Sequence, residues 1–299
     1  MALIVEDGTG LANAESYLSV ADADAYFLAH GNPSDWVDIK ATGVLHLPVT
    51  PTDGDTVVIG ATTYTFRTAS PSVDGEILIG ADESESLQNL HAGILDDIDI
   101  VNGSTGKFQV IGANANTGVS ARDATAKTLS LEALTGGTAG NSIVTTSTLT
   151  NLANHFEETT LLDGLDQKEE SLRLGTQYLD NVYAQRWKGR RKEELQALAW
   201  PRVEIEDFDG FIIDTDSLPQ KLKDATAESA IRNITESDGL FPDLENQGFI
   251  KSQFDKIDVL STKTEFAGAG GTPTGVKSFR IIDALLSSLI FLSGRLARG

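Results

Sequence analysis

Positive charge is concentrated in one short segment of this sequence, residues 185–202, called the basic segment below. Five basic side chains lie within seven positions, and two tryptophans accompany them. Cations bind phosphate and aromatic rings stack on bases, so this composition can bind single-stranded nucleic acid. The candidate residues are Arg186, Trp187, Lys188, Arg190, Arg191, Lys192, Trp200 and Arg202.

Two other interpretations of the basic segment are open. Arginine and tryptophan are common anchors of protein interfaces, so the segment could contact another subunit. Alternatively, the tryptophans are buried, and the stems of the cations lie over them and pair with acids such as Glu193 and Glu194. The sequence alone therefore favours no single choice among a nucleic-acid site, an interface and a structural segment.

The chain as a whole is acidic. It has 44 Asp and Glu residues against 23 Lys and Arg, a formal net charge of -21 over 299 residues. Free nucleic acid would be repelled on average, so any DNA contact must be local. The chain has no cysteine, which excludes disulfides and thiolate metal sites, and its four histidines leave little for a histidine metal centre.

Motifs typical of catalysis or cofactor binding are incomplete in this sequence. In "GSTGKF", Lys107 is followed by Phe108, where a phosphate-binding loop needs Ser or Thr. In "IEDFDGFIIDTD", taking Gly210 as the turn glycine of a calcium loop places Ile205 at the first ligand position. We therefore expect no enzymatic activity, no catalytic residues, no cofactor and no metal.

The sequence patterns that predict secondary structure differ along the chain. Residues 1–40 and 157–299 have helical periodicity, with Ser19 as a predicted N-cap. Residues 41–156 are rich in Gly, Thr and alternating β-branched residues, which predicts strands such as "TVVIG" and "TYTFRT". Leu87, Leu90, Ile94 and Ile98, at spacings of three and four, predict one amphipathic helix among them. We expect an α+β fold in which a mainly α-helical body, residues 1–40 and 157–299, is interrupted by an inserted β-rich α+β domain, residues 41–156.

Four segments, in this order, resemble a family of tailed-phage proteins that are often labelled DnaT-like and single-stranded-DNA-binding. They are "ALIVEDGTGLANAESYLSVADADAYF", "ESLRLGTQYLDNVYAQRWKGRR", "QALAWPRVEIEDFDG" and "LPQKLKDATAESAIR". In fold and gene order the family is similar to head–tail connector, or adaptor, proteins. The insertion resembles a domain that recurs in phage structural proteins, through "DGDTVVIGATTYTFRT", "GEILIGADESESLQNLHAGI" and "TAGNSIVTTST".

The resemblance implies a structural protein that forms a ring, commonly twelve-fold, below the portal of a tailed bacteriophage. Such a ring extends the DNA channel and links the capsid to the tail. The implied partners are further copies of the chain, the portal protein, a tail or next connector protein and genomic double-stranded DNA in the lumen, without a membrane. The implied location is the head–tail junction of the virion, assembled in the bacterial cytoplasm. The alternative is a DnaT-like single-stranded-DNA-binding protein.

In this context we expect the basic segment to face a neighbouring subunit or the DNA channel. We also expect the apolar C-terminal stretch around residues 281–292 to contact the portal or a neighbour, because it exceeds what one packed face requires. A fully buried core helix is the alternative there. The candidate residues are Ile281, Ile282, Leu285, Leu286, Leu289, Ile290, Arg295 and Arg298.

Overall fold

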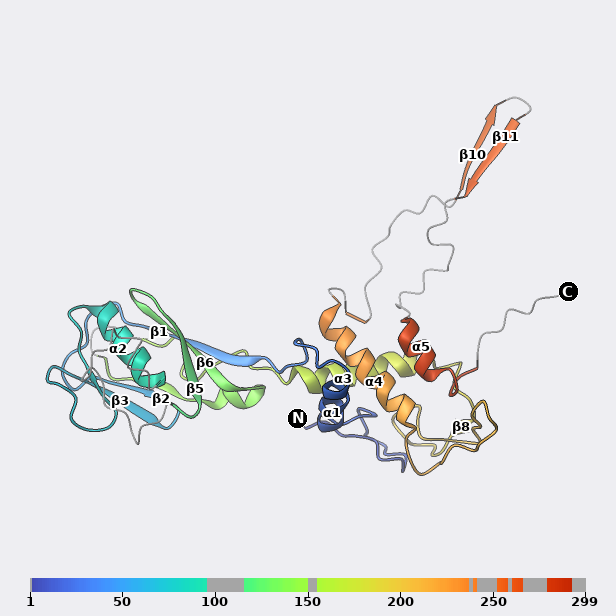
Figure 1. Cartoon of the computed structure of the whole chain (residues 1–299), viewed down its shortest axis with the longest axis horizontal. Helices are drawn as coiled ribbons and strands as arrows, with labels where there is room; N and C mark the ends of the chain where they lie inside the picture. Colours follow the sequence, from blue (N-terminus) through green and yellow to red (C-terminus); the bar gives the residue numbers. More distant parts are fainter. Residues whose placement is uncertain are drawn as a thin grey trace. The chain divides into compact units, whose positions relative to one another are not determined.

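The computed structural model divides the chain into two compact units (Figure 1). Unit 1 comprises Met1–Trp36 and Lys168–Gly299, and unit 2 comprises Val37–Gln167. The predicted insertion, residues 41–156, lies within unit 2. The structure describes residues 2–95, 116–149, 155–236, 239–240, 252–257, 260–265 and 279–291.

The described residues of unit 2 form two sheets and one long helix. The first sheet is antiparallel with strand order β1-β6-β5, and the second has the order β4-β3-β2-β7, with β3 and β4 parallel. A short 3-10 helix, Thr138–Ser142, follows β6. The other bounds are β1 Lys40–His46, β2 Thr56–Ile59, β3 Thr62–Arg67, β4 Glu76–Leu78, α2 Glu83–Leu95, β5 Val119–Ala124, β6 Thr128–Gly136 and β7 Thr145–Ser147.

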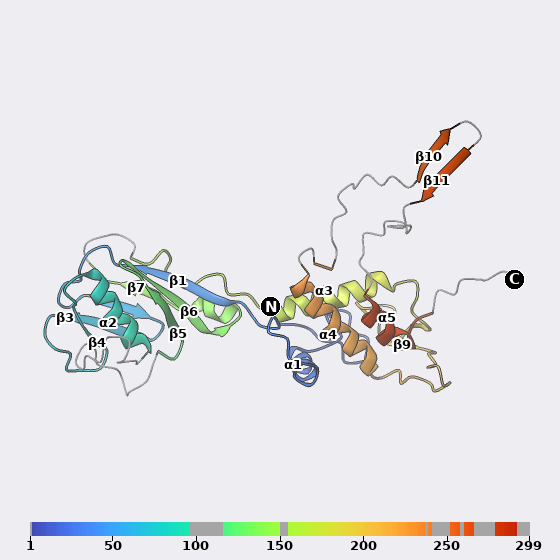
Figure 2. The same cartoon turned by 45° about the horizontal axis from the view of Figure 1, so that its top comes forward.

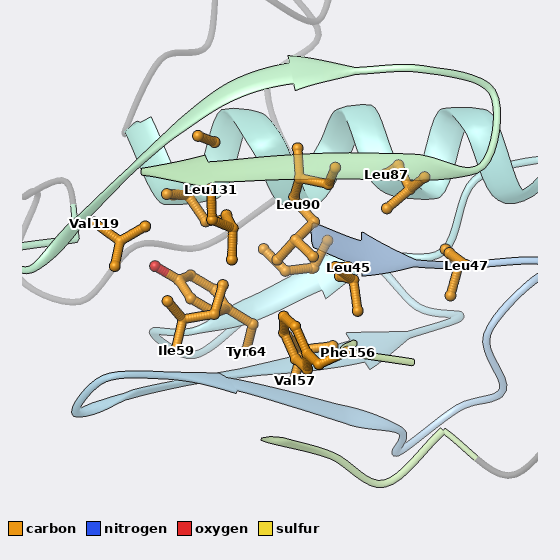
Figure 3. Close-up of a cluster of buried hydrophobic side chains, with 14 of the residues drawn as sticks. Leu45, Leu47, Val57, Ile59, Tyr64, Leu87, Leu90, Val119, Leu131 and Phe156 are labelled. Atoms are coloured by element: carbon orange, nitrogen blue, oxygen red, sulfur yellow. The ribbon is translucent and has the colours of Figure 1, made fainter. Parts of the chain in front are cut away.

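Side chains from both sheets and from α2 form one core in unit 2. Leu45 and Leu131 come from the first sheet, Val57 from the second and Leu90 from α2, and each is at most 1% exposed (Figure 3). In β2 and β3 every second residue is buried, because successive side chains of a strand point to opposite faces. The alternation in "TVVIG" and "TYTFRT" thus predicted these two strands, and the structure confirms them.

The chain enters and leaves unit 2 through two segments that pair with each other. The backbone groups of Ile39 and Leu165 exchange two hydrogen bonds of 3.0 Å, and those of Thr42 and Leu162 exchange two of 2.8 and 2.9 Å. Antiparallel pairing of this kind brings the two ends of unit 2 side by side.

Unit 1 contains four helices and two pairs of short antiparallel strands among its described residues. Strand β8 is labelled in Figure 1 and strand β9 in Figure 2. Strands β10 and β11 pair only with each other, as do β8 and β9. The bounds are α1 Val20–Ala29, α3 Gln167–Val182, β8 Arg190–Arg191, β9 Arg202–Val203, α4 Gln220–Thr235, β10 Ser252–Ile257, β11 Leu260–Glu265 and α5 Arg280–Leu286.

The expectation of a mainly α-helical body was wrong. The described residues form five α-helices and eleven strands in several sheets, and unit 1 itself has four strands. Between Val182 and Gln220 there is no helix, because Gly189 adopts a left-handed φ of +64° and Pro201 and Pro219 interrupt the backbone pattern. Helical periodicity in this sequence therefore marks single helices rather than a helical body.

Local signals at the helix ends were more informative. The side chain of Ser19 accepts a hydrogen bond from the backbone N–H of Asp22, which confirms the predicted N-cap of α1.

Helices α3 and α4 approach closely at Gly175, where an added Cβ would lie 2.8 Å from the Ser229 hydroxyl and 2.9 Å from the Ala230 nitrogen. Glycine is needed there for the close approach of the two backbones.

The C-terminal apolar helix is shorter than its sequence pattern indicated. Helix α5 ends at Leu286, and the chain continues through a turn to Ile290. Ile282, Leu286 and Leu289 are at most 1% exposed and belong to the same cluster as Tyr178 of α3 and Tyr183 just beyond it. The stretch therefore contributes to the core of unit 1.

Candidate nucleic-acid interface

The basic segment begins beyond the end of α3 and forms a turn followed by strand β8. The backbone N–H groups of Arg186 and Trp187 donate to the Tyr183 carbonyl, which closes the turn. Gly189 then redirects the chain, and a Cβ at that position would lie 2.1 Å from the Val203 carbonyl oxygen. Only glycine allows this approach, which brings β8 alongside β9.

Both tryptophans of the basic segment are buried. Trp187 is 4% exposed and Trp200 is fully buried, and their rings meet edge to face with centroids 5.9 Å apart. They pack with Tyr17, Tyr178 and Tyr183 in one cluster. A buried indole cannot stack on a base, so these rings serve the core of unit 1 in this structure.

A partly buried carboxyl group lies beside Trp200 and holds the neighbouring backbone. Asp180, on α3, accepts hydrogen bonds from the Tyr17 hydroxyl at 2.5 Å and from the Ala199 backbone N–H at 2.9 Å. The same Tyr17 hydroxyl accepts from the backbone N–H of Trp200 at 3.1 Å. Burial raises the pKa of Asp180 to about 6 and also raises that of Tyr17.

Most cations of the basic segment are engaged within their own chain. Arg202 donates to the backbone carbonyls of Lys188 and Gly189, both at 2.7 Å, and burial lowers its pKa. Lys192 forms a 2.6 Å ion pair with Asp216, and this hydrogen bond raises the pKa of Lys192. These contacts hold the loops of unit 1 together.

Arg186 and Lys188 are similarly engaged. Arg186 lies 3.7 Å from the Asp283 carboxylate and over the Tyr183 ring. The Lys188 ammonium donates to the Ser288 carbonyl at 2.9 Å and lies 5.1 Å from the centre of the Phe208 ring. Neither cation is therefore freely available to a phosphate.

The two arginines of β8 differ from the rest, because both are exposed. Arg190 forms a 3.1 Å ion pair with Glu204, and both side chains are more than two-thirds exposed. Arg191 donates to the Gln196 carbonyl. An exposed ion pair of this kind contributes about 0–1 kcal/mol, so a phosphate can replace Glu204 at little cost.

The predicted C-terminal candidates fall into three groups. Ile282, Leu286, Leu289 and Ile290 are buried, and Leu285 is partly buried against the same cluster. Ile281 is 43% exposed. The remaining two candidates, Arg295 and Arg298, lie outside the described residues.

Two features of this region were not found from the sequence. One is the Asp180–Tyr17 pair, because no local pattern marks which acid of an acidic chain is buried. The other is the exposure of Phe208 and Phe211 in "IEDFDGFIIDTD", a segment whose sequence favours a solvated acidic turn over a calcium loop. In the structure Asp207 instead accepts hydrogen bonds from the backbone of its own turn.

No cluster of three or more metal-ligating side chains occurs in the part of the chain that the structure describes. None of the helices in the described ranges has the length and apolarity needed to span a bilayer.

Comparison with known proteins gives one family match. The model of a family described as "Putative DnaT-like ssDNA binding protein" matches residues 1–46 and 127–299. The unmatched residues, 47–126, lie within unit 2. No curated protein and no solved structure matches the chain significantly.

Proposed function

The chain belongs to this DnaT-like family, whose model covers most of its length, and from that premise we propose that it binds single-stranded DNA through Arg190 and Arg191. The observation that carries the proposal is the exposure of both arginines on β8, because the other cations of the segment are partly buried. Arg190 and Arg191 have partners of their own, Glu204 and the Gln196 carbonyl, which a phosphate would have to replace. Guanidinium groups bind phosphate oxygens through paired N–H donors.

The buried tryptophans limit the mode of binding. Without an exposed indole in the basic segment, the interaction rests on phosphate contacts and not on base stacking at these rings. Two neutralised phosphates correspond to a slope of about -1.4 in a plot of log K against log salt for a single strand. Binding is thus expected to be modest, insensitive to base sequence and sensitive to salt.

We predict that the double variant Arg190→Ala/Arg191→Ala binds a fluorescein-labelled 25-residue oligo(dT) about tenfold more weakly at low salt. Fluorescence anisotropy between 25 and 200 mM salt measures both the affinity and the slope. The matched control is Arg122→Ala/Lys127→Ala, which removes two exposed cations from unit 2 and should leave binding unchanged.

Tryptophan emission gives a second readout in the same titration. All three tryptophans of the chain are at most 5% exposed, so oligo(dT) should bind without quenching them. Absence of binding by the wild-type chain at 25 mM salt, or equal losses in the two double variants, would rule out the β8 arginines as the DNA site.

A second candidate function is that of a head–tail connector subunit of a tailed phage. Two observations favour this function. Most cations of the basic segment are paired within the chain, and the chain as a whole has a net charge of -21, so its surface repels phosphate. DNA could pass through a ring of such subunits without binding tightly. The ordered sequence resemblance described above supports the same candidate.

This second function predicts self-assembly. Sedimentation velocity and negative-stain images of the purified full-length chain, alone and with the portal protein of the same genome, should show closed rings or a complex with the portal. A chain that stays monomeric at about 100 μM under both conditions would exclude the connector function while leaving the DNA-binding proposal standing.

A further inference from the structure

A short acidic hairpin, residues 204–216, follows β9. Its two arms are joined by hydrogen bonds from Ile213 N–H to the Ile205 carbonyl, 2.9 Å, and from Asp207 N–H to the Phe211 carbonyl, 3.0 Å. At the tip, Gly210 has a φ of +83°, which suits a tight turn. The Asp207 carboxylate accepts the backbone N–H groups of two turn residues, so the tip has a defined conformation.

The acidic hairpin exposes three large apolar side chains. Phe208 is 60% exposed, Phe211 71% and Ile212 77%. The bases of the two arms are anchored instead, since Ile205 is buried and Ile213 is partly buried against the core of unit 1. Three adjacent exposed apolar side chains on an ordered turn are characteristic of a binding surface rather than of an ordinary loop.

The acidic hairpin itself carries only negative charge, although the Lys188 ammonium of the basic segment lies over the Phe208 ring and donates to the Glu206 carbonyl. Residues 204–216 contain six acids and no Lys or Arg. Two of the six, Glu204 and Asp216, form ion pairs with the basic segment. Hydrogen bonds from the Asp216 backbone and from Ser217 lower the pKa of Asp214 and keep it ionised. Within the described residues, the remaining four acids (Glu206, Asp207, Asp209 and Asp214) have no ion pair.

We propose that the acidic hairpin docks into a partner protein that offers an apolar pocket rimmed by Lys or Arg. Phe208, Phe211 and Ile212 would fill the pocket, and the four unpaired carboxylates would meet the basic rim. This surface is separate from the arginines of β8, so the inference does not depend on DNA binding.

Charge selects this partner over two other occupants. DNA is disfavoured because its phosphates would meet four unpaired carboxylates. A second copy of the chain is disfavoured because the described surface pockets themselves carry acids. The lining of one pocket includes Glu157, Glu158 and Asp163 and no Lys or Arg, and in two other pockets the single cation, Lys223 or Arg232, lies beside two acids.

The experiment uses a labelled synthetic helical peptide with one leucine face and one lysine face as the probe, titrated with the full-length chain. The double variant Phe208→Ser/Phe211→Ser should bind it at least about tenfold more weakly than wild type, because two anchor rings are lost. The matched control Leu28→Ser removes an apolar side chain that is 74% exposed on α1 and should bind like wild type. Both variants change exposed side chains, and equal unfolding midpoints would confirm that they fold.

Two further probes decide the identity of the occupant. The same peptide with glutamate in place of lysine should not bind, and Glu206→Gln/Asp209→Asn should weaken binding of the lysine peptide at low salt only. The proposal is overturned if the serine double variant binds like wild type. Displacement of the peptide by oligo(dT) from wild type, but not from that variant, would identify DNA as the occupant and overturn the proposal. Self-association that wild type shows in sedimentation and the variant lacks would identify a second copy of the chain and overturn it as well.

Discussion

Trp200→Ala should lower the free energy of unfolding by about 3–5 kcal/mol, the range for removing a fully buried large aromatic side chain. The indole is inaccessible to solvent and packs against Trp187 in the largest cluster of unit 1, so its loss leaves a cavity that the surrounding aromatic rings cannot fill. Urea unfolding followed by circular dichroism measures the difference.

The control for this variant lies in the same segment. Leu195 is 80% exposed, and Leu195→Ala should change the free energy of unfolding by no more than about 0.5 kcal/mol. Trp200→Ala also separates two roles for the tryptophan. A variant as stable as wild type that no longer binds oligo(dT) would show that Trp200 stacks on bases, contrary to its buried position here.

Asp180 should make the stability of the protein depend on pH between about 4 and 6. Its pKa is raised by burial from 3.8 to about 6, so the folded state binds this proton more tightly than the unfolded state. Its stabilising contribution is therefore complete below pH 3.8 and is lost as the pH rises through 6. A shift of two pKa units corresponds to about 3 kcal/mol.

The measurement compares wild type with Asp180→Asn. The free energy of unfolding of wild type, relative to the variant, should fall by up to about 3 kcal/mol from pH 4 to pH 7. The amide also alters the hydrogen bond from Tyr17, but that change adds an offset that does not vary with pH. Parallel pH profiles for the two proteins would contradict the prediction.

The exposed carboxyl group of Asp214 should give a pH dependence of stability with the opposite sign. Backbone and side-chain hydrogen bonds lower the pKa of Asp214, so its contribution is present above the pKa of the unfolded chain and is lost as the pH falls. Asp214→Asn should therefore reduce stability at neutral pH more than at acidic pH, which distinguishes its profile from that of Asp180→Asn.

Local patterns predicted several elements correctly. Ser19 caps α1, and the alternation in β2 and β3 matches their buried faces. Leu87, Leu90 and Ile94 of α2 are buried as their spacing indicated, while Ile98, the fourth residue of that pattern, lies outside the described residues. Each of these signals lies within one element, where side-chain direction follows directly from the period of the backbone. Such signals need no information about the partner element.

Which side chains of the candidate site are buried or paired depends on residues that are distant in the sequence. Trp200 is placed by Tyr17 and Asp180, which are 183 and 20 positions away in the sequence, and no local spacing links the three. The pairing of Lys192 with Asp216 likewise became visible only in the folded chain. The predicted fold class was wrong for a related reason, since a helical period does not show where loops and short strands separate the helices.

The paired entry and exit of unit 2 place the two ends of this part of the chain close together. Ile39 and Leu165 exchange two backbone hydrogen bonds, and such pairs hold their Cα atoms about 5.5 Å apart. A chain from which the residues between them are removed therefore has two ends that a short turn can join. The family match does not follow this boundary, because it extends over residues 127–165 of unit 2 and breaks only between residues 46 and 127.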